Sequence, residues 1–240
     1  MHYDFVLILL FFAIAVPLLG RRRVRQLLAM PDTTKMDRLA LYASTIAFQW
    51  LAAAVVFWRA NAHGISAAQL GLAIPNVRLT LIVSICLAGL ILANQLASLR
   101  RLTAHSEEMK GTIVQLALKI FPRDNLERLV FFALVSTVAV CEELIYRGFV
   151  QYVFQAWLWG VMIAGVICSA ALFALAHLYQ GVRGLASTFV IALLFAGVRA
   201  WTGSLVAPLV GHFVADLTVG LLAPSRLRAA QGTQIQTNRR

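Results

Sequence analysis

The sequence predicts an all-α fold, a polytopic membrane helix bundle of about seven transmembrane helices with the N-terminus outside and the C-terminus in the cytoplasm. Of the 240 residues, 60% are apolar and only 13% are charged, and the mean hydropathy is +0.79. Apolar runs long enough to cross a bilayer recur along the chain, which excludes an ordinary soluble protein. Between these runs, Lys and Arg gather on alternate loops.

The apolar runs define the expected helices. Each has close to the roughly 17–25 residues that a spanning helix needs, and the first is the shortest. The expected spans are 5–19, 39–58, 79–99, 129–154, 158–178, 185–201 and 205–222. The first span lacks a basic segment in front of it, so we expect a retained helix and not a signal peptide. Residues 112–121 are apolar on one side only, which predicts either an amphipathic helix in the membrane interface or a short helix packed on the bundle.

The basic residues set the orientation. The loops after the first and third spans are rich in Lys and Arg, and so is the C-terminal tail. The loops on the opposite side hold only Arg59, Arg78 and Arg199. Because cytoplasmic loops carry the excess of positive charge, the C-terminus is expected in the cytoplasm.

The net charge of +11 does not indicate a nucleic-acid partner. The basic residues flank membrane segments, and no soluble basic domain is long enough to grip a duplex. The cysteines are Cys86, Cys141 and Cys168, and all lie within predicted spans. An odd number of cysteines in membrane segments predicts no disulfide framework.

Ionisable residues inside the spans are few and occur in a pattern. Charge in the membrane centre is costly, about 2.5–3.5 kcal/mol for a central Arg or Asp on insertion scales, and such residues are usually functional. Three spans each contribute a pair of residues four apart, which places both members on one helical face. The pairs are Glu143 with Arg147, Phe173 with His177, and His212 with Asp216, and Glu142 directly precedes the first.

If the three faces converge, they form a polar pocket suited to hydrolysis of a peptide bond. This reaction needs a bound water, a base to deprotonate it and a donor for the oxyanion. Glu142 is the candidate base, and His177 could hold or polarise the water. His212, oriented by Asp216, could donate to the oxyanion. We expect Glu143 and Arg147 to form a structural ion pair that leaves Glu142 free.

Each residue also has a purely structural explanation. A histidine in a membrane helix often forms an interhelical hydrogen bond, and Phe173 alone is ordinary core packing. Two other functions use the same residues. A proton-coupled transporter or an immunity-type membrane binding protein would use the buried carboxylates as a relay. A thiol peptidase would pair Cys141 or Cys168 with His177.

The three motifs resemble those of the CPBP family, the CAAX-protease and bacteriocin-processing intramembrane endopeptidases, also called the abortive-infection family. The residues that carry the resemblance are Glu142, Glu143, Arg147, Phe173, His177, His212 and Asp216. The similarity spans about 122–222. It implies a glutamate-type intramembrane endopeptidase in which Glu142 and His177 activate water and His212 and Asp216 support the oxyanion. Glu143, Arg147 and Phe173 would support the site.

Residue 216 departs from the prenyl-protein members of the family, whose third motif ends in Asn. An ionised Asp cannot donate a hydrogen bond, so Asp216 is expected to orient His212. No cofactor is favoured, although Glu142, His177 and His212 could hold a zinc ion. The resemblance implies a peptide or protein substrate at the membrane: a prenylated C-terminus, a bacteriocin leader or a sorting tail. The protein is expected in the lipid bilayer as a multi-pass protein, in the plasma (inner) membrane if the source is prokaryotic.

The resemblance divides the chain into three parts. Residues 1–121 hold three N-terminal transmembrane helices and the segment that could be an interfacial helix, 122–224 a catalytic four-helix core, and 225–240 a polar cytoplasmic tail that we expect to be disordered. One difficulty concerns depth. Glu142 is expected about 20 Å from the cytoplasmic end of its span, whereas His177 lies near that end of the next. Their meeting requires tilt, a later start of the span, or a helix that extends beyond the bilayer.

Overall fold

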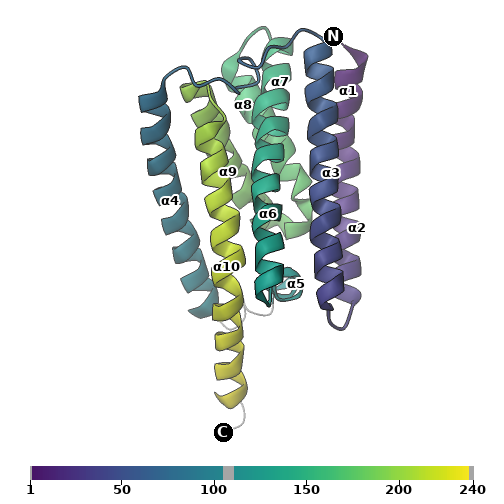
Figure 1. The fold of residues 1–240 in the computed structure, drawn as a ribbon, viewed down its shortest axis with the longest axis vertical. Helices are drawn as coiled ribbons and strands as arrows, with labels where there is room; N and C mark the ends of the chain where they lie inside the picture. The colour runs from purple at the N-terminus through teal and green to yellow at the C-terminus, as the bar shows by residue number, and fades with distance from the viewer. Residues whose placement is uncertain (1, 105–110, 238–240) are drawn as a thin grey trace.

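The computed structural model describes residues 2–104 and 111–237, and the regular elements in these residues are all helices. The predicted all-α fold is therefore confirmed. Figure 1 shows long helices standing side by side in a single bundle, with the connecting segments at its two ends.

The N-terminal half contains three long helical rods. The first is continuous and consists of α1 (Tyr3–Leu10), the π-helical η1 (Phe11–Ala15) and α2 (Val16–Ala29). It is followed by α3 (Lys35–Ala62) and α4 (Val77–Ala104). Thr34 begins α3 with a capping box, since its hydroxyl accepts from the Asp37 N–H and the Asp37 carboxylate accepts from the Thr34 N–H. Such a cap satisfies backbone donors that the first helical turn leaves unpaired.

The C-terminal half begins with α5 (Thr112–Ile120), which lies in the stretch predicted to form a short helix. The remaining elements are α6 (Asn125–Glu142), the π-helical η3 (Glu143–Val150), α7 (Gln151–Trp157), α8 (Met162–Ala176), the 3₁₀ turn η4 (Leu178–Gln180), α9 (Gly181–Thr202) and α10 (Val206–Thr237). We expected the polar tail from residue 225 to be disordered, but α10 continues to Thr237, and of this tail only 238–240 lie outside the described residues. Ala, Arg and Gln, which favour helices, are common in this stretch.

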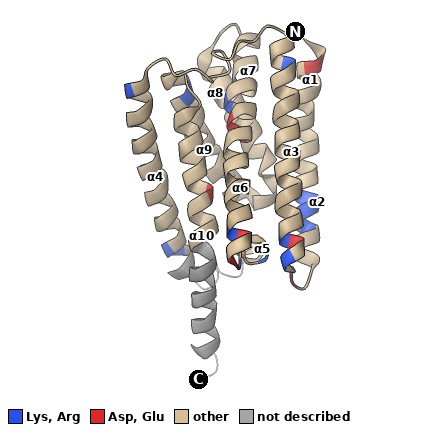
Figure 2. Cartoon of the chain, in the orientation of Figure 1, with Lys and Arg blue, Asp and Glu red and all other residues tan. Residues whose placement is uncertain are grey.

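Five helices of the described chain are long and apolar enough to cross a membrane: Tyr3–Ala29, Lys35–Ala62, Val77–Arg101, Asn125–Trp157 and Leu178–Thr202. The spans expected at 158–178 and 205–222 correspond to shorter apolar helices, Met162–Ala176 and Val206–Leu222. Figure 2 shows most Lys, Arg, Asp and Glu residues near the two ends of the bundle. The chain is thus a multi-pass integral membrane protein, while the total of seven spans stays a prediction.

The two halves of the chain pack against each other. α3 packs on α6, α8 packs on α7 and α9, and α10 packs on α4 and α6. A single cluster of buried side chains joins Phe5 and Leu9 of α1 to Val56 of α3, Phe149 of η3 and Phe173 of α8. The N-terminal helices therefore form part of the wall around the polar motifs.

The hairpin of α7 and α8 resolves the difficulty of depth. Glu142 lies fifteen residues before Trp157, the last residue of α7, and His177 lies fifteen residues after Met162, the first residue of α8. Because the two arms are antiparallel and equally long, both side chains reach the same level. The rod of α6, η3 and α7 is 33 residues long, more than a spanning helix needs.

Candidate active site

The first motif lies where the α-helix changes to a π-helix. Glu142 is the last residue of α6, and η3 runs from Glu143 to Val150. Such π-helical segments are rare and are frequently found at functional sites. The Tyr146 carbonyl in this segment accepts a hydrogen bond from the Ser169 hydroxyl of α8 at 2.7 Å. The neighbouring helix thus supplies a polar partner to the altered backbone.

Glu143 is the centre of a fully buried network. Its Oε1 accepts from Arg147 Nη1 at 3.0 Å and lies 2.8 Å from His212 Nδ1. The side chains of Glu143 and Arg147 are both 0% exposed. The ion pair expected from the spacing is therefore present, and it also holds the histidine of the third motif.

Glu142 is held differently and remains partly open. Its Oε1 accepts a hydrogen bond from Gln49 Nε2 of α3 at 2.7 Å. Its Oε2 lies 3.8 Å from His212 Nε2 and has no hydrogen-bond partner among the described residues. The side chain as a whole is 15% exposed, but Oε2 itself is a buried atom. One oxygen of Glu142 is therefore held by Gln49, and the other is buried without a hydrogen-bond partner in the part of the chain that the structure describes.

Asp216 forms an ion pair with His212, but a looser one than Glu143 does. Its Oδ2 lies 3.6 Å from His212 Nε2, which is longer than a hydrogen bond. The close partner of the imidazole is Glu143, on Nδ1. Nε2 thus faces two carboxylate oxygens, from Glu142 and Asp216, with a gap that a small polar group could bridge.

His177 follows the last residue of α8, and its tautomer can be assigned. Its Nδ1 lies 2.9 Å from the Phe173 carbonyl oxygen, which can only accept, so Nδ1 carries the hydrogen. In the neutral ring Nε2 is then an acceptor. The fixed ring orientation follows from the four-residue spacing of the motif.

Phe173 connects the three motifs. Its ring centroid lies 4.6 Å from that of His177 and 5.9 Å from that of His212. The Arg147 guanidinium stands 4.1 Å above the same ring. Phe173 therefore contacts one member of each motif, which explains why an aromatic residue belongs to a polar constellation.

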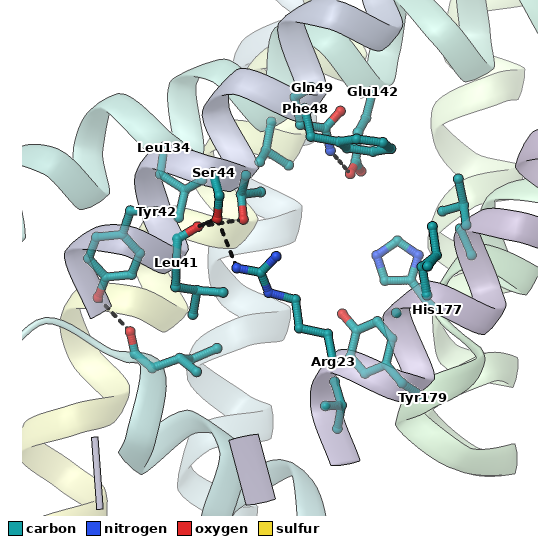
Figure 3. A pocket seen from close by; sticks show the side chains of 18 of the residues that line it. Arg23, Leu41, Tyr42, Ser44, Phe48, Gln49, Leu134, Glu142, His177 and Tyr179 are labelled. Atoms are coloured by element: carbon teal, nitrogen blue, oxygen red, sulfur yellow. Dashed lines mark hydrogen bonds between the residues drawn. The ribbon is translucent and has the colours of Figure 1, made fainter. Parts of the chain in front are cut away.

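A cavity of about 750 Å³ opens beside Glu142. Figure 3 shows Glu142, Gln49 and His177 at its edge, with Tyr179 and Arg23 further along. We expected Glu142, His177, His212 and Asp216 to surround one pocket. Glu142 and His177 line this cavity, whereas His212 and Asp216 do not.

Neither candidate thiol lies on this cavity. Cys141 is 0% exposed within the core cluster that also contains Phe149, and Cys168 lines no part of the cavity. The geometry gives no support to a thiol peptidase.

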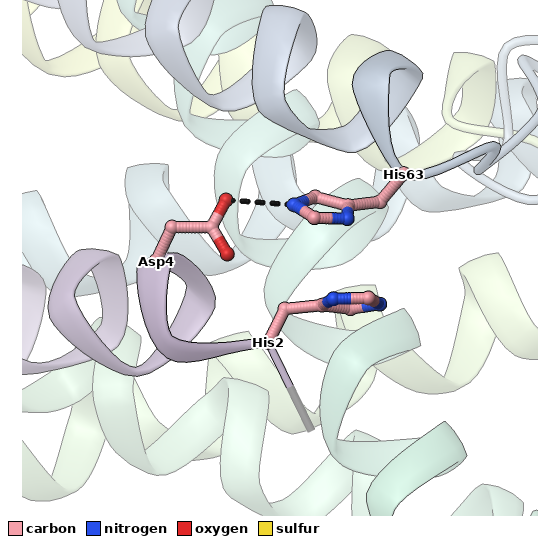
Figure 4. Close-up of side chains that lie close together, drawn as sticks. All are labelled: His2, Asp4 and His63. Atoms are coloured by element: carbon pink, nitrogen blue, oxygen red, sulfur yellow. Dashed lines mark hydrogen bonds and ion pairs between the residues drawn. The ribbon is translucent and has the colours of Figure 1, made fainter.

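The motif residues do not form a compact set of metal ligands. Among the described residues, no three ligand atoms from Glu142, His177, His212 and Asp216 lie within 4.8 Å of one another. One group does so elsewhere, His2, Asp4 and His63, at the end of the bundle where the chain begins. Figure 4 shows the Asp4–His63 contact, and Asp4 Oδ2 also accepts from Arg59 at 2.7 Å. A metal there would have to displace a guanidinium.

Gln49 is the residue of this site that sequence reasoning missed. We interpreted it as an interhelical hydrogen bonder. It is one, but its partner is Glu142. The available signal was a single amide within an apolar span, which does not reveal its partner.

Most of the C-terminal half of the chain matches a known family of proteases. Residues 124–218 match the model of the type II CAAX prenyl endopeptidase Rce1-like family. Residues 124–218 are an Rce1-like CAAX prenyl endopeptidase domain. No curated protein and no solved structure matches the chain.

The Rce1-like domain contains all three motifs and begins immediately before α6. Its family consists of proteases, so the protein is an enzyme of the CAAX protease type with a peptide or protein substrate. The matched residues exclude α1 to α4. Gln49, and the part of the cavity wall formed by α2 and α3, therefore come from outside the matched region.

Proposed function

We propose that the protein is a glutamate-type intramembrane endopeptidase that hydrolyses a peptide bond of a membrane-associated protein or peptide. The observation that carries the proposal is the state of Glu142. One carboxylate oxygen is held by Gln49, the other has no hydrogen-bond partner, and the group faces a cavity that His177 also lines. This is the arrangement that a general base for water requires.

In the proposed mechanism, Glu142 and His177 activate one water molecule. Nε2 of neutral His177 accepts one hydrogen of the water and orients it, because Nδ1 is committed to the Phe173 carbonyl. Glu142 takes the other proton as the water oxygen attacks the carbonyl carbon. Glu142 then returns that proton to the leaving amine nitrogen as the peptide C–N bond breaks.

His212 supports the charge that develops on the carbonyl oxygen. As an imidazolium it donates from both ring nitrogens, from Nδ1 to Glu143 and from Nε2 toward the oxyanion. Asp216, 3.6 Å from Nε2, lies close enough to stabilise the cation without accepting the same hydrogen. The ion pair of Glu143 and Arg147 holds the His212 ring through the Glu143–Nδ1 contact.

The proposal also assigns a membrane topology and a role to each part of the chain. We propose seven spans with the N-terminus outside and the C-terminus in the cytoplasm, in the plasma (inner) membrane if the source is prokaryotic. Residues 1–121 complete the cavity wall, 122–224 hold the catalytic helices, and 225–240 extend into the cytoplasm. The reaction needs no metal in this proposal; a zinc ion would be held by Glu142, His177 and His212 only after these side chains move together.

Three substrate classes fit this topology: prenylated C-termini, bacteriocin leaders and sorting tails. Each carries a peptide bond near the membrane surface. A comparison of membrane proteomes between cells with the wild-type protein and cells with the Glu142→Gln variant would identify the substrate through fragments that are lost.

The test uses the purified protein in liposomes with a quenched fluorescent peptide. Glu142→Gln, His177→Ala and His212→Ala should each lower kcat/KM by about 10²–10⁴, the usual contribution of a general acid or base. His63→Ala is the control, since His63 lies outside the site and pairs with Asp4. Full activity in Glu142→Gln would refute the proposal. A pH-dependent ion flux without cleavage would instead favour a proton-coupled transporter.

A further inference from the structure

The cavity beside Glu142 has an uneven distribution of charge. Its charged lining residues are Glu142, Arg22 and Arg23. The carboxylate belongs to α6, and both arginines belong to α2, outside the matched domain. Most of the remaining wall is apolar, including Phe12, Leu19 and other side chains of the first rod. The cavity thus combines a catalytic carboxylate, an apolar wall and a basic region.

A hydrogen bond to Ser44 of α3 fixes the orientation of the Arg23 side chain. Its Nη2 donates to Ser44 Oγ of α3 at 2.8 Å, and Ser44 Oγ in turn donates to the Leu41 carbonyl at 3.0 Å. A hydroxyl has one hydrogen, so Ser44 acts toward Arg23 only as an acceptor. Figure 3 shows the guanidinium projecting into the space between Ser44 and His177.

Arg23 lacks an acidic partner among the residues that the structure describes, whereas Arg38 and Arg123, outside α2, each have one. Arg38 pairs with Glu127 at 2.7 Å. Arg123 pairs with Asp32 at 2.9 Å and holds the pKa of that carboxyl at about 2. A guanidinium has five N–H donors, enough to bind Ser44 and still grip a carboxylate with two parallel hydrogen bonds. Arg23 is therefore available to an anionic ligand.

The distance between Glu142 and Arg23 can be estimated from their partners on α3. Gln49 contacts Glu142, and Ser44 contacts Arg23. These residues are five positions apart, which corresponds to about 7–8 Å along a helix axis. An extended peptide covers about 3.3–3.6 Å per residue, so about two residues fit between the groups.

We propose that Arg23 binds a carboxylate of the substrate peptide, about two residues from the bond that Glu142 hydrolyses. The inference rests on the proposed function, because it takes this cavity as the place where the peptide lies. The apolar wall of the cavity can accommodate apolar side chains of the substrate. The basic region can bind the single negative charge of the substrate carboxylate. Arg22 adds positive charge to the same wall.

Binding can be measured without cleavage in the Glu142→Gln variant, held in phosphatidylcholine nanodiscs. The probes are fluorescein-labelled Ala/Val peptides that differ only at the last residue. One ends in a free carboxylate, one in an amide, and one in an amide with Asp at the last position. The free-acid peptide should bind about tenfold more tightly than the amide, as expected for a hydrogen bond to a charged group. The Asp peptide shows whether a side-chain carboxylate is equally accepted.

Adding Arg23→Gln should abolish the preference for the carboxylate. Arg25→Gln is the matched control, since it removes the same charge from the same helix at a residue that does not line the cavity. Equal binding of acid and amide peptides, a preference that survives Arg23→Gln, or an equal loss in Arg25→Gln would each overturn the proposal. The last two outcomes would point to lipid headgroups or the general surface field as the partner of Arg23.

The two proposals fail separately. If the wild-type protein cleaves no peptide while the binding preference depends on Arg23, the carboxylate subsite stands and the hydrolytic function falls. If cleavage depends on Glu142 but acid and amide peptides bind alike, the hydrolytic function stands and the role of Arg23 falls.

Discussion

Gln49 determines which oxygen of Glu142 is free to act. The residue is 9% exposed, and its amide donates to Oε1 from a helix that packs against α6. Because an amide nitrogen can only donate, the contact suits a carboxylate and occupies one of its oxygens. Oε2 is left facing His212 at 3.8 Å. We infer that Gln49 is a positioning residue for the general base.

Replacing Gln49 with Leu keeps the approximate volume and removes the donor. We expect kcat/KM for peptide hydrolysis to fall about ten- to a hundredfold, since a hydrogen bond to a charged group is lost. Trp50→Phe is the control, because Trp50 Nε1 donates to Thr137 Oγ1 and so joins the same two helices without touching Glu142. If both variants lose activity equally, the cause is α3–α6 packing and not the position of Glu142.

At the scale of elements, the α7–α8 hairpin sets the levels of Glu142 and His177. The two helices approach closely at Gly165 of α8. A Cβ added there would stand 2.6 Å from the Gln151 carbonyl oxygen and 3.0 Å from Gln155 Cβ. The backbone of α7 would have to move, and the hairpin would lose its register. A small residue at a helix crossing is a common device in membrane proteins.

Gly165→Ala should therefore lower both stability and activity. Overpacking of this kind costs about 1–3 kcal/mol, which exceeds the gain of up to about 1 kcal/mol from replacing a helical Gly. Gly197→Ala in α9 is the control, since a Cβ there meets nothing within 4 Å. Thermal unfolding and peptide hydrolysis, measured on both variants, provide the test. An unchanged Gly165→Ala protein would show that the crossing tolerates a methyl group.

The positions of the helices could be predicted from the sequence, because each spanning segment is a long run of apolar residues. The π-helical turn of η3 could not. Glu143 and Arg147 meet across four residues in an α-helix as well, so their spacing does not reveal it. The change depends on partners such as Ser169, which reaches the Tyr146 carbonyl from another helix. Such contacts appear only after the helices are packed.

At the scale of the whole molecule, the N-terminal helices complete a site whose motifs lie in the C-terminal half. The motif residues could be predicted, because ionisable groups are so rare inside the spans that each stands out. Gln49 and Arg23 could not be assigned in this way. A polar residue in an apolar helix, and an arginine at a helix end, are both common. Their importance depends on which way α2 and α3 face, which the sequence does not state.

A buried ion pair joins these two parts of the molecule. Arg38 of α3 donates from Nε and Nη2 to the two oxygens of Glu127 of α6, at 3.1 and 2.7 Å. The side chains are only 5% and 1% exposed. Removing one member of such a pair leaves a buried charge without a partner, at a cost of about 3–5 kcal/mol. Since α3 also carries Gln49, a looser α3 should weaken the hold on Glu142.

We therefore expect Arg38→Met to lower the apparent Tm by on the order of 10 °C and to reduce hydrolysis in parallel. The double variant Arg38→Met/Glu127→Leu should recover much of the loss, because it removes the unpaired charge as well. Lys35→Met is the matched control on α3, since the side chains of Lys35 and its partner Asp124 are 46% and 43% exposed. Exposed pairs contribute little, so this variant should melt close to the wild type. If Arg38→Met melts like Lys35→Met, this ion pair contributes little to joining the two halves, and Gln49 reaches Glu142 without its support.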